Sequence, residues 1–229
     1  MTPDLSAFGD LRILRPLPGG HRNQVWLVET KAGPCVAKST DLSEAALAWL
    51  APLQAAARAA GFTMPAFHRA RNGNISANGW TMEDWHEGPA LQMSDLPTLQ
   101  PRLQAFHAAI PSLPQRPGQH SLPDQATAPL PHLPPDIATL CRAALMPIAD
   151  HPTRRIHGDI TASNLIHTAH GPALIDWDEA RCDLAFLDFM HVAPANPTEI
   201  RAHLAGEIIT GWTPEPAYAK ACANRLAHL

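Results

Sequence analysis

The segment 156–178 constrains this chain more than any other feature, because it sets three polar side chains among short apolar runs. It begins Ile-His-Gly-Asp-Ile-Thr-Ala-Ser-Asn, so that four residues separate Asp159 from Asn164, and it ends Leu-Ile-Asp-Trp-Asp with Asp176 after an apolar run. Phosphoryl transfer needs a group that orients the attacking hydroxyl and oxygen ligands for a metal on the phosphates. The spacing predicts Asp159 as the catalytic base and Asn164 with Asp176 as Mg²⁺ ligands.

Each of these three side chains also has an ordinary structural explanation. Asp159 could satisfy backbone N–H groups in a turn, and Asn164 and Asp176 could cap neighbouring turns. All three occur in order, however, around a predicted hairpin with strands at 164–168 and 173–176. Because short motifs arise by chance more often than such combinations do, the joint functional interpretation is favoured.

Composition narrows the possible classes of protein. The chain has 229 residues, 45% of them hydrophobic, a net charge of -4 and a pI near 6.3, which suits one large domain or two lobes and gives no indication of a nucleic-acid partner. No apolar run approaches the roughly 18 residues of a membrane helix, and no signal peptide is evident. The four cysteines are scattered, so we expect neither a disulfide framework nor a metal cluster, and a cytoplasmic setting.

Strands dominate the first part of the chain and helices the second, which predicts an α+β fold with two lobes. Glycine and proline at positions 88 and 89 break the chain, so we expect lobes at 1–86 and 87–229. Expected strands are 12–17, 24–30, 35–39 and 79–85, and expected helices are 41–60, which Pro52 can split, 96–110, 136–149, 184–192, 198–211 and 216–229.

Residues 111–135 form a proline-rich connection that holds eight of the 24 prolines. We expect no regular element there, and we expect the connection to border the acceptor side of the site. The sequence leaves open whether it is a mobile lid or a fixed wall.

A lysine and a glutamate in the first part could position nucleotide phosphates. Lys38 ends the apolar run Cys-Val-Ala-Lys and can reach phosphates as a point charge, although a strand lysine can also simply protect a sheet edge. Glu44 could pair with Lys38 from the following helix, although residues 41–44 also fit a capping box. We favour the ion pair.

Other residues complete the predicted nucleotide and substrate contacts. Backbone groups of Gly19 and Gly20 could approach phosphates, although Gly-Gly is more often only a turn. The strand near residues 80–85 should join the lobes, and its backbone groups could hydrogen-bond the adenine of the nucleotide. The nucleotide-binding set is therefore Lys38, Glu44, Gly19, Gly20, Glu83, Asp84 and Trp85. Asp178 and Glu179 could attract a cationic substrate or simply be solvated.

With these motifs in their order, the chain resembles the aminoglycoside phosphotransferase and choline kinase-like family, distant relatives of protein kinases. The matching segments are 17–26, 36–38, 44–50, 82–88, 103–107, 157–164 and 174–177. The resemblance implies a protein-kinase-like fold: a small N-terminal β-sheet lobe with one helix, a mostly helical C-terminal lobe, and ATP held between them with Mg²⁺. It also implies that Asp183 and Asp188 are acidic positions after the metal loop, with Asp188 bracing the catalytic loop.

The acceptor is less defined than the reaction. The resemblance implies a hydroxyl of a small metabolite of the choline, thiamine, amino-sugar or aminoglycoside type. The segment after Asp188 is short for the family, which suggests a small acceptor or a partner that completes the site. A pseudokinase or scaffold and a protein kinase remain alternatives, although the short interval between Asp176 and Asp188 disfavours the latter. GTP could replace ATP, and the oligomeric state stays open.

Overall fold

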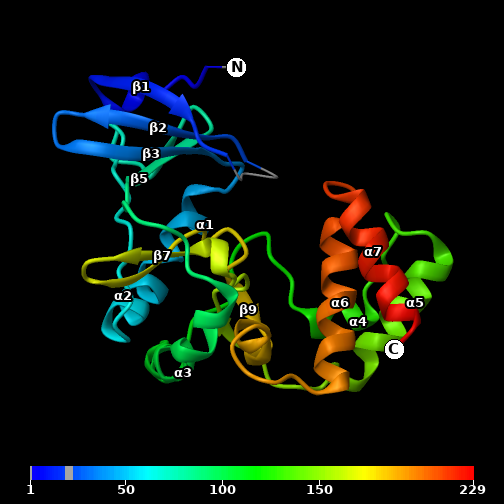
Figure 1. Cartoon of the computed structure of the whole chain (residues 1–229). Coiled ribbons are helices and arrows are strands. Elements are labelled where there is room, and N and C mark those ends of the chain that lie inside the picture. Colours follow the sequence, from blue (N-terminus) through cyan, green and yellow to red (C-terminus); the bar gives the residue numbers. More distant parts are fainter. Residues whose placement is uncertain (1, 19–22) are drawn as a thin grey trace. The chain divides into compact units, whose positions relative to one another are not determined.

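A computed structural model describes residues 2–18 and 23–229, and its elements confirm an α+β chain with the sheet first and most helices later (Figure 1). Its contacts define two compact units. The first comprises Met1–Ala90 and Leu165–Ile175, and the second comprises Leu91–Asn164 and Asp176–Leu229. The segment Leu165–Ile175 therefore groups with the N-terminal part of the chain.

The first unit contains an antiparallel five-stranded sheet of order β1-β2-β3-β5-β4. The strands are β1 (Leu11–Pro16), β2 (Val25–Thr30), β3 (Gly33–Ser39), β4 (Ser76–Ala77) and β5 (Trp80–Asp84). Side chains alternate across a strand. Cys35, Ala37 and Met82 are buried in a core on one face, so Lys38 lies on the other face of β3.

Two helices lie between β3 and β4 in the chain, α1 (Glu44–Ala48) and α2 (Ala51–Ala59). Ser43 caps α1 by accepting from the Ala46 N–H at 3.2 Å. Pro52 lies in the first turn of α2, where a missing N–H costs nothing. The predicted split of helix 41–60 at Pro52 is confirmed.

The hairpin of β7 (Leu165–Thr168) and β8 (Gly171–Leu174) packs within the first unit. The His167 N–H donates to the Pro89 carbonyl at 2.8 Å, and the Leu174 N–H donates to Thr63 at 3.0 Å. These bonds to distant segments satisfy the edges of a short hairpin that would be marginal in isolation. The predicted hairpin is confirmed.

The second unit is mainly helical, with a core that α4, α5, α6 and α7 share (Figure 1). Its helices are α3 (Gln100–Ala109), α4 (Leu122–Thr127), α5 (Pro135–Leu145), α6 (Pro197–Gly211) and α7 (Pro216–Ala227), with 3₁₀ turns η2 (Met93–Leu99), η3 (Met146–Ile148), η4 (Ala162–Asn164) and η5 (Ala185–Phe189). Two short strands, β6 (Arg154–Ile156) and β9 (Arg181–Asp183), pair antiparallel. No helix among the described residues is both long and apolar enough to cross a membrane.

The expectation that 111–135 holds no regular element is wrong, because α4 lies within it. Ser121 and Asp124 form a capping box, in which the Ser121 Oγ accepts from the Asp124 N–H at 3.2 Å. Pro123 falls in the first turn, where proline is compatible with a helix. Proline breaks a helix interior but is tolerated in the first turn, where both Pro123 of α4 and Pro135 of α5 lie.

Candidate active site

The predicted base Asp159 follows β6, a strand that the sequence did not predict. The pairing of Ile156 with Arg181 continues into a close approach between Gly158 and the Glu179 carbonyl. Gly158 has φ +90°, and a Cβ there would lie 2.5 Å from the Glu179 oxygen. Only glycine therefore fits this position without moving the backbone.

A fully buried carboxylate holds the backbone before Asp159. Asp188 accepts from the N–H groups of His157 at 3.0 Å and Gly158 at 2.8 Å, and its Oδ2 lies 3.0 Å from the His107 Nε2. Burial by itself would raise the pKa of Asp188, but the bonds and charge of His107, with the charge of His157 and the Gly158 N–H, lower it below the ordinary value. Asp188 is thus an ionised brace of the loop, as the family resemblance implies.

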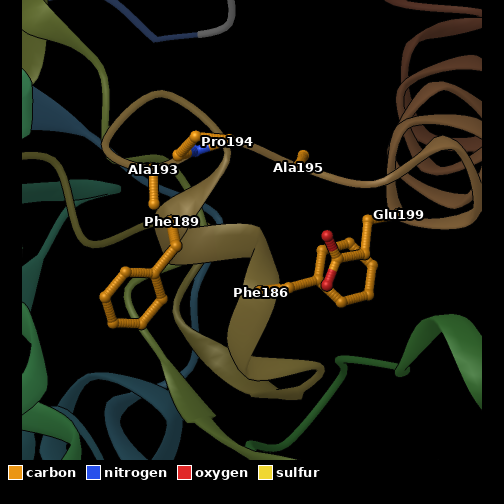
Figure 2. A pocket seen from close by; sticks show the side chains of 6 residues that line it. All are labelled: Phe186, Phe189, Ala193, Pro194, Ala195 and Glu199. Atoms are coloured by element: carbon orange, nitrogen blue, oxygen red, sulfur yellow. The ribbon is translucent and has the colours of Figure 1, made fainter.

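Two phenylalanines of η5, the 3₁₀ turn that carries Asp188, lie on either side of this aspartate in the sequence. The Phe189 ring lies 5.3 Å from the His107 ring. Phe186 and Phe189 also line a hollow of about 220 Å³, and Figure 2 shows Phe186 extending toward Glu199 while Phe189 points to the other side of η5. Glu199 accepts from the Asn196 N–H at 2.9 Å in the capping box of α6. The one charged residue of this lining, Glu199, is therefore already engaged in capping a helix.

Asp159 itself is half-buried and held by Asn164. The Asn164 Nδ2 donates to the Asp159 carboxylate at 2.6 Å and to its carbonyl at 3.1 Å. Burial raises the pKa of Asp159, and Asp176 and Glu179 raise it further, whereas His157 and Asn164 oppose the rise. A carboxylate with a raised pKa is a stronger base, which suits proton removal from a hydroxyl.

The two predicted metal ligands fit Mg²⁺ by their chemistry. Because the Asn164 Nδ2 faces Asp159, the amide oxygen is the atom left for a metal. Asp176 is exposed and has φ +62°, a left-handed conformation that is uncommon outside glycine and that occurs often at functional sites. Mg²⁺ prefers hard oxygen ligands and completes its shell with water and phosphate. No group of three or more His, Cys, Asp or Glu is placed for a metal within residues 2–18 and 23–229, and a two-ligand site does not require one.

The predicted substrate residues lie directly after Asp176. Glu179 Oε2 is 3.4 Å from the Arg181 Nη1, and Arg181 also donates to the Asp183 carboxylate at 2.8 Å. Arg181 therefore offsets part of the negative charge of Glu179. Asp178 is half-buried in the same turn.

The remaining candidates belong to the first unit and are described within it. Lys38 lies opposite Thr81 of β5, and Val36 on the same face lies opposite Glu83. The Glu44 carboxylate accepts from the Ile75 N–H at 2.8 Å and the Ser76 N–H at 3.2 Å. Glu44 thus fixes the approach to β4, and its predicted pairing with Lys38 stays a prediction.

Asp84 belongs to the segment that the sequence analysis expects to bind the nucleotide's base, and its contacts are well defined. Its carboxylate lies 2.8 Å from the His68 Nε2 and accepts from the Ala66 N–H at 3.1 Å, while its own N–H donates to the Ala66 carbonyl. The Asp84 amide is therefore already used. Asp84 is the last residue of β5, Glu83 lies opposite Val36, and Trp85 follows the strand. Gly19 and Gly20 lie outside the described residues.

Comparison with known proteins identifies the family of this chain. Residues 13–223 match the model of the phosphotransferase enzyme family, APH. Since the match spans most of the chain, the protein belongs to this family. A search of curated protein sequences gives no match.

Solved structures show the same protein-kinase-like fold at low sequence identity. A thermostable mutant of aminoglycoside phosphotransferase APH(4)-Ia, in ternary complex with ADP and hygromycin B, aligns at 13% identity and TM-score 0.66 over 96% of this chain and 94% of that one. A choline/ethanolamine kinase family protein from Mesorhizobium loti aligns at 16% identity and TM-score 0.54, over 98% of this chain and 89% of that one. Choline kinase from Cryptosporidium parvum Iowa II aligns at 9% identity and TM-score 0.56, over 95% of this chain and 88% of that one.

Proposed function

We propose that this protein transfers the γ-phosphoryl group of ATP to a hydroxyl of a small metabolite, with Mg²⁺ as the metal. The observation that carries the proposal is Asp159, a half-buried carboxylate of raised pKa held at 2.6 Å by the predicted metal ligand Asn164. Family membership and the nucleotide complex of the APH(4)-Ia neighbour support it.

In the proposed reaction, Asp159 accepts the proton of the attacking hydroxyl. The hydroxyl oxygen forms a bond to the γ-phosphorus, and the bond from that phosphorus to the bridging oxygen of ADP breaks. Asn164 holds the Asp159 carboxylate in place for this step. Mg²⁺, when held by Asn164 and Asp176, supplies charge neutralisation on the phosphates.

Lys38 and Glu44 are proposed to position the phosphates of the nucleotide. The backbone near Glu83 and Trp85 is proposed to contact its adenine. The acceptor is proposed to be an alcohol of the choline, thiamine, amino-sugar or aminoglycoside type. Asp178 and Glu179 are the acidic residues that a cationic acceptor would meet, Glu179 with its charge partly offset by Arg181.

A thermal-shift series with ATP or GTP, with and without Mg²⁺, tests nucleotide binding, because a ligand of the folded state raises Tm by mass action. We expect a Mg²⁺-dependent Tm shift that Lys38→Met reduces and that Lys31→Met, at an exposed lysine in the turn between β2 and β3, does not. ADP release should then be measured over a panel of hydroxyl metabolites. A nucleotide shift without ADP release for any acceptor would favour a pseudokinase, and no shift at all would contradict nucleotide binding.

A further inference from the structure

The proline-rich connection places a buried arginine under the loop that follows Asp176. Arg116 is only 1% exposed and is the largest of the fully buried side chains. Its Nη1 lies 3.1, 2.8 and 3.0 Å from the carbonyl oxygens of Trp177, Asp178 and Ala180. The turn 177–180 thus wraps its carbonyls around one guanidinium nitrogen.

Such a turn needs hydrogen-bond donors at its centre. Three carbonyl oxygens that converge on one point repel each other and must be satisfied when buried. Burial lowers the pKa of Arg116, while Asp178 and Glu179 raise it, and an arginine stays protonated in proteins regardless. Arg116 is therefore a permanent positive charge beneath an acidic loop.

Arg116 comes from a firmly anchored stretch of chain. The neighbouring Gln115 side chain donates to the Cys182 carbonyl at 2.9 Å and accepts from the Cys182 N–H at 2.8 Å, as a strand partner would. Further along, the Leu122 N–H donates to the buried Asp183 carboxylate at 3.0 Å. These bonds describe a fixed wall along β9, which is the opposite of a mobile lid.

The turn is also connected to the catalytic loop. The Trp177 ring lies edge-on to the His157 ring at a centroid distance of 4.5 Å, and His157 Nδ1 accepts from the Asp159 N–H at 3.2 Å. Asp176, which directly precedes Trp177, holds its left-handed backbone at the start of this turn. A shift of the turn would therefore move both the proposed metal ligand and the neighbour of the proposed base.

We infer that Arg116 is a positioning residue for the metal: by holding the carbonyls of 177–180, it fixes the orientation of Asp176 toward Mg²⁺. Arg116 contacts neither metal nor substrate in this role. The inference rests on the proposed function and extends it to a residue of the proline-rich connection.

The test compares Arg116→Met and Arg116→Lys with the wild type and with Arg155→Met, the same change at a half-buried arginine of β6 that donates to Ser112. The measured quantity is the Mg²⁺ concentration that gives half of the maximal nucleotide-dependent Tm shift. Loss of a residue that orients a metal ligand raises this midpoint at least about tenfold. We expect that rise for Arg116→Met, a smaller one for Arg116→Lys, and none for Arg155→Met.

Hydrogen exchange of the peptide spanning 176–181 gives a second readout that does not depend on nucleotide. Arg116→Met should speed exchange there while leaving the α6 and α7 peptides protected, which shows that the variant is folded. An unchanged Mg²⁺ midpoint in folded Arg116→Met would overturn the positioning role. If the wild type binds no nucleotide, the proposed function fails, and exchange still decides whether Arg116 holds the turn.

Discussion

Two loops of the second unit are held by buried charges of opposite sign. The loop before Asp159 offers its N–H groups, and the Asp188 carboxylate accepts two of them. The turn after Asp176 offers its carbonyls, and the Arg116 guanidinium donates to three. In each case the buried charge complements the exposed end of the peptide dipoles, which is a stronger tie than a neutral hydrogen bond.

The difference between the loops lies in where the brace comes from. Asp188 is one of the acidic positions that the family resemblance implies, whereas Arg116 comes from the proline-rich connection, where the sequence shows no motif. Asp188 and Asp159 also differ in protonation: contacts with His107 and the backbone lower the pKa of the first, while burial raises that of the second. The environment of Asp188 therefore favours the ionised carboxylate, whereas that of Asp159 favours the protonated one.

Removing the carboxylate of Asp188, which holds the first loop, should have the largest effect on stability. Asp188→Ala leaves two buried N–H groups and His107 without their acceptor, so we expect a loss of about 4 kcal/mol in unfolding free energy. Urea denaturation measures it. Asp136→Ala, at an exposed aspartate in the first turn of α5, should cost no more than about 1 kcal/mol. Equal losses in the two variants would show that Asp188 is not a brace.

The two loops approach each other closely where Gly158 meets the Glu179 carbonyl, and replacing glycine by alanine tests this contact. Gly158 and Gly73 have nearly the same backbone, with φ +90° and +86°, but only Gly158 would place a Cβ against backbone atoms. Gly73→Ala should cost about 1 kcal/mol for its backbone conformation, and Gly158→Ala at least about 2 kcal/mol more for the clash with Glu179. Unfolding free energies that agree between the two variants would argue against tight contact at Gly158.

Replacing Asp176 should show how much its left-handed backbone conformation costs in unfolding free energy. Asp176→Gly removes the cost of a left-handed non-glycine residue, so the variant should gain about 1 kcal/mol in unfolding free energy. It should also lose Mg²⁺-dependent nucleotide stabilisation, since a carboxylate ligand is missing. Asp176→Asn keeps the backbone cost and separates the two effects. A less stable Asp176→Gly would mean that the side chain contributes more to folding than its backbone costs.

The smallest expected effect concerns pH and follows from the raised pKa of Asp159. Because the folded state favours the protonated form, the ionised carboxylate opposes folding above the folded pKa. Asp159→Asn should therefore have a slightly higher Tm than the wild type at neutral pH, and the difference should vanish as pH falls below the unfolded value. A variant that is less stable at neutral pH would contradict the direction of the shift.

Much of this architecture could be predicted because its determinants are local. Strands β2 and β3 alternate and meet at a tight turn, and the hairpin after Asn164 is short and apolar. The three polar residues of the motif lie in one segment, so their spacing is visible in the sequence. The direct bond between Asp159 and Asn164 agrees with that spacing.

The missed features depend on partners that lie far along the chain. Strands β6 and β9 have three residues each, too few for a period to be seen, and they form only because they find each other. Arg116 and Gln115 look like ordinary polar residues among prolines, and only their burial against 177–182 gives them a role. The one clue in the sequence is that Arg116 is the only Lys or Arg between residues 111 and 135.

The central claim is that Asp159 is the base of a Mg²⁺-dependent phosphoryl transfer. It is tested most directly by the rate of ADP formation from ATP and Mg²⁺ with a hydroxyl metabolite panel, for the wild type, Asp159→Asn and Asp150→Asn, the last at an exposed aspartate nearby in sequence. We expect Asp159→Asn to slow acceptor-dependent ADP formation by about 10³-fold while nucleotide still raises Tm, and Asp150→Asn to match the wild type. Acceptor-dependent ADP formation by Asp159→Asn at the wild-type rate would contradict the account.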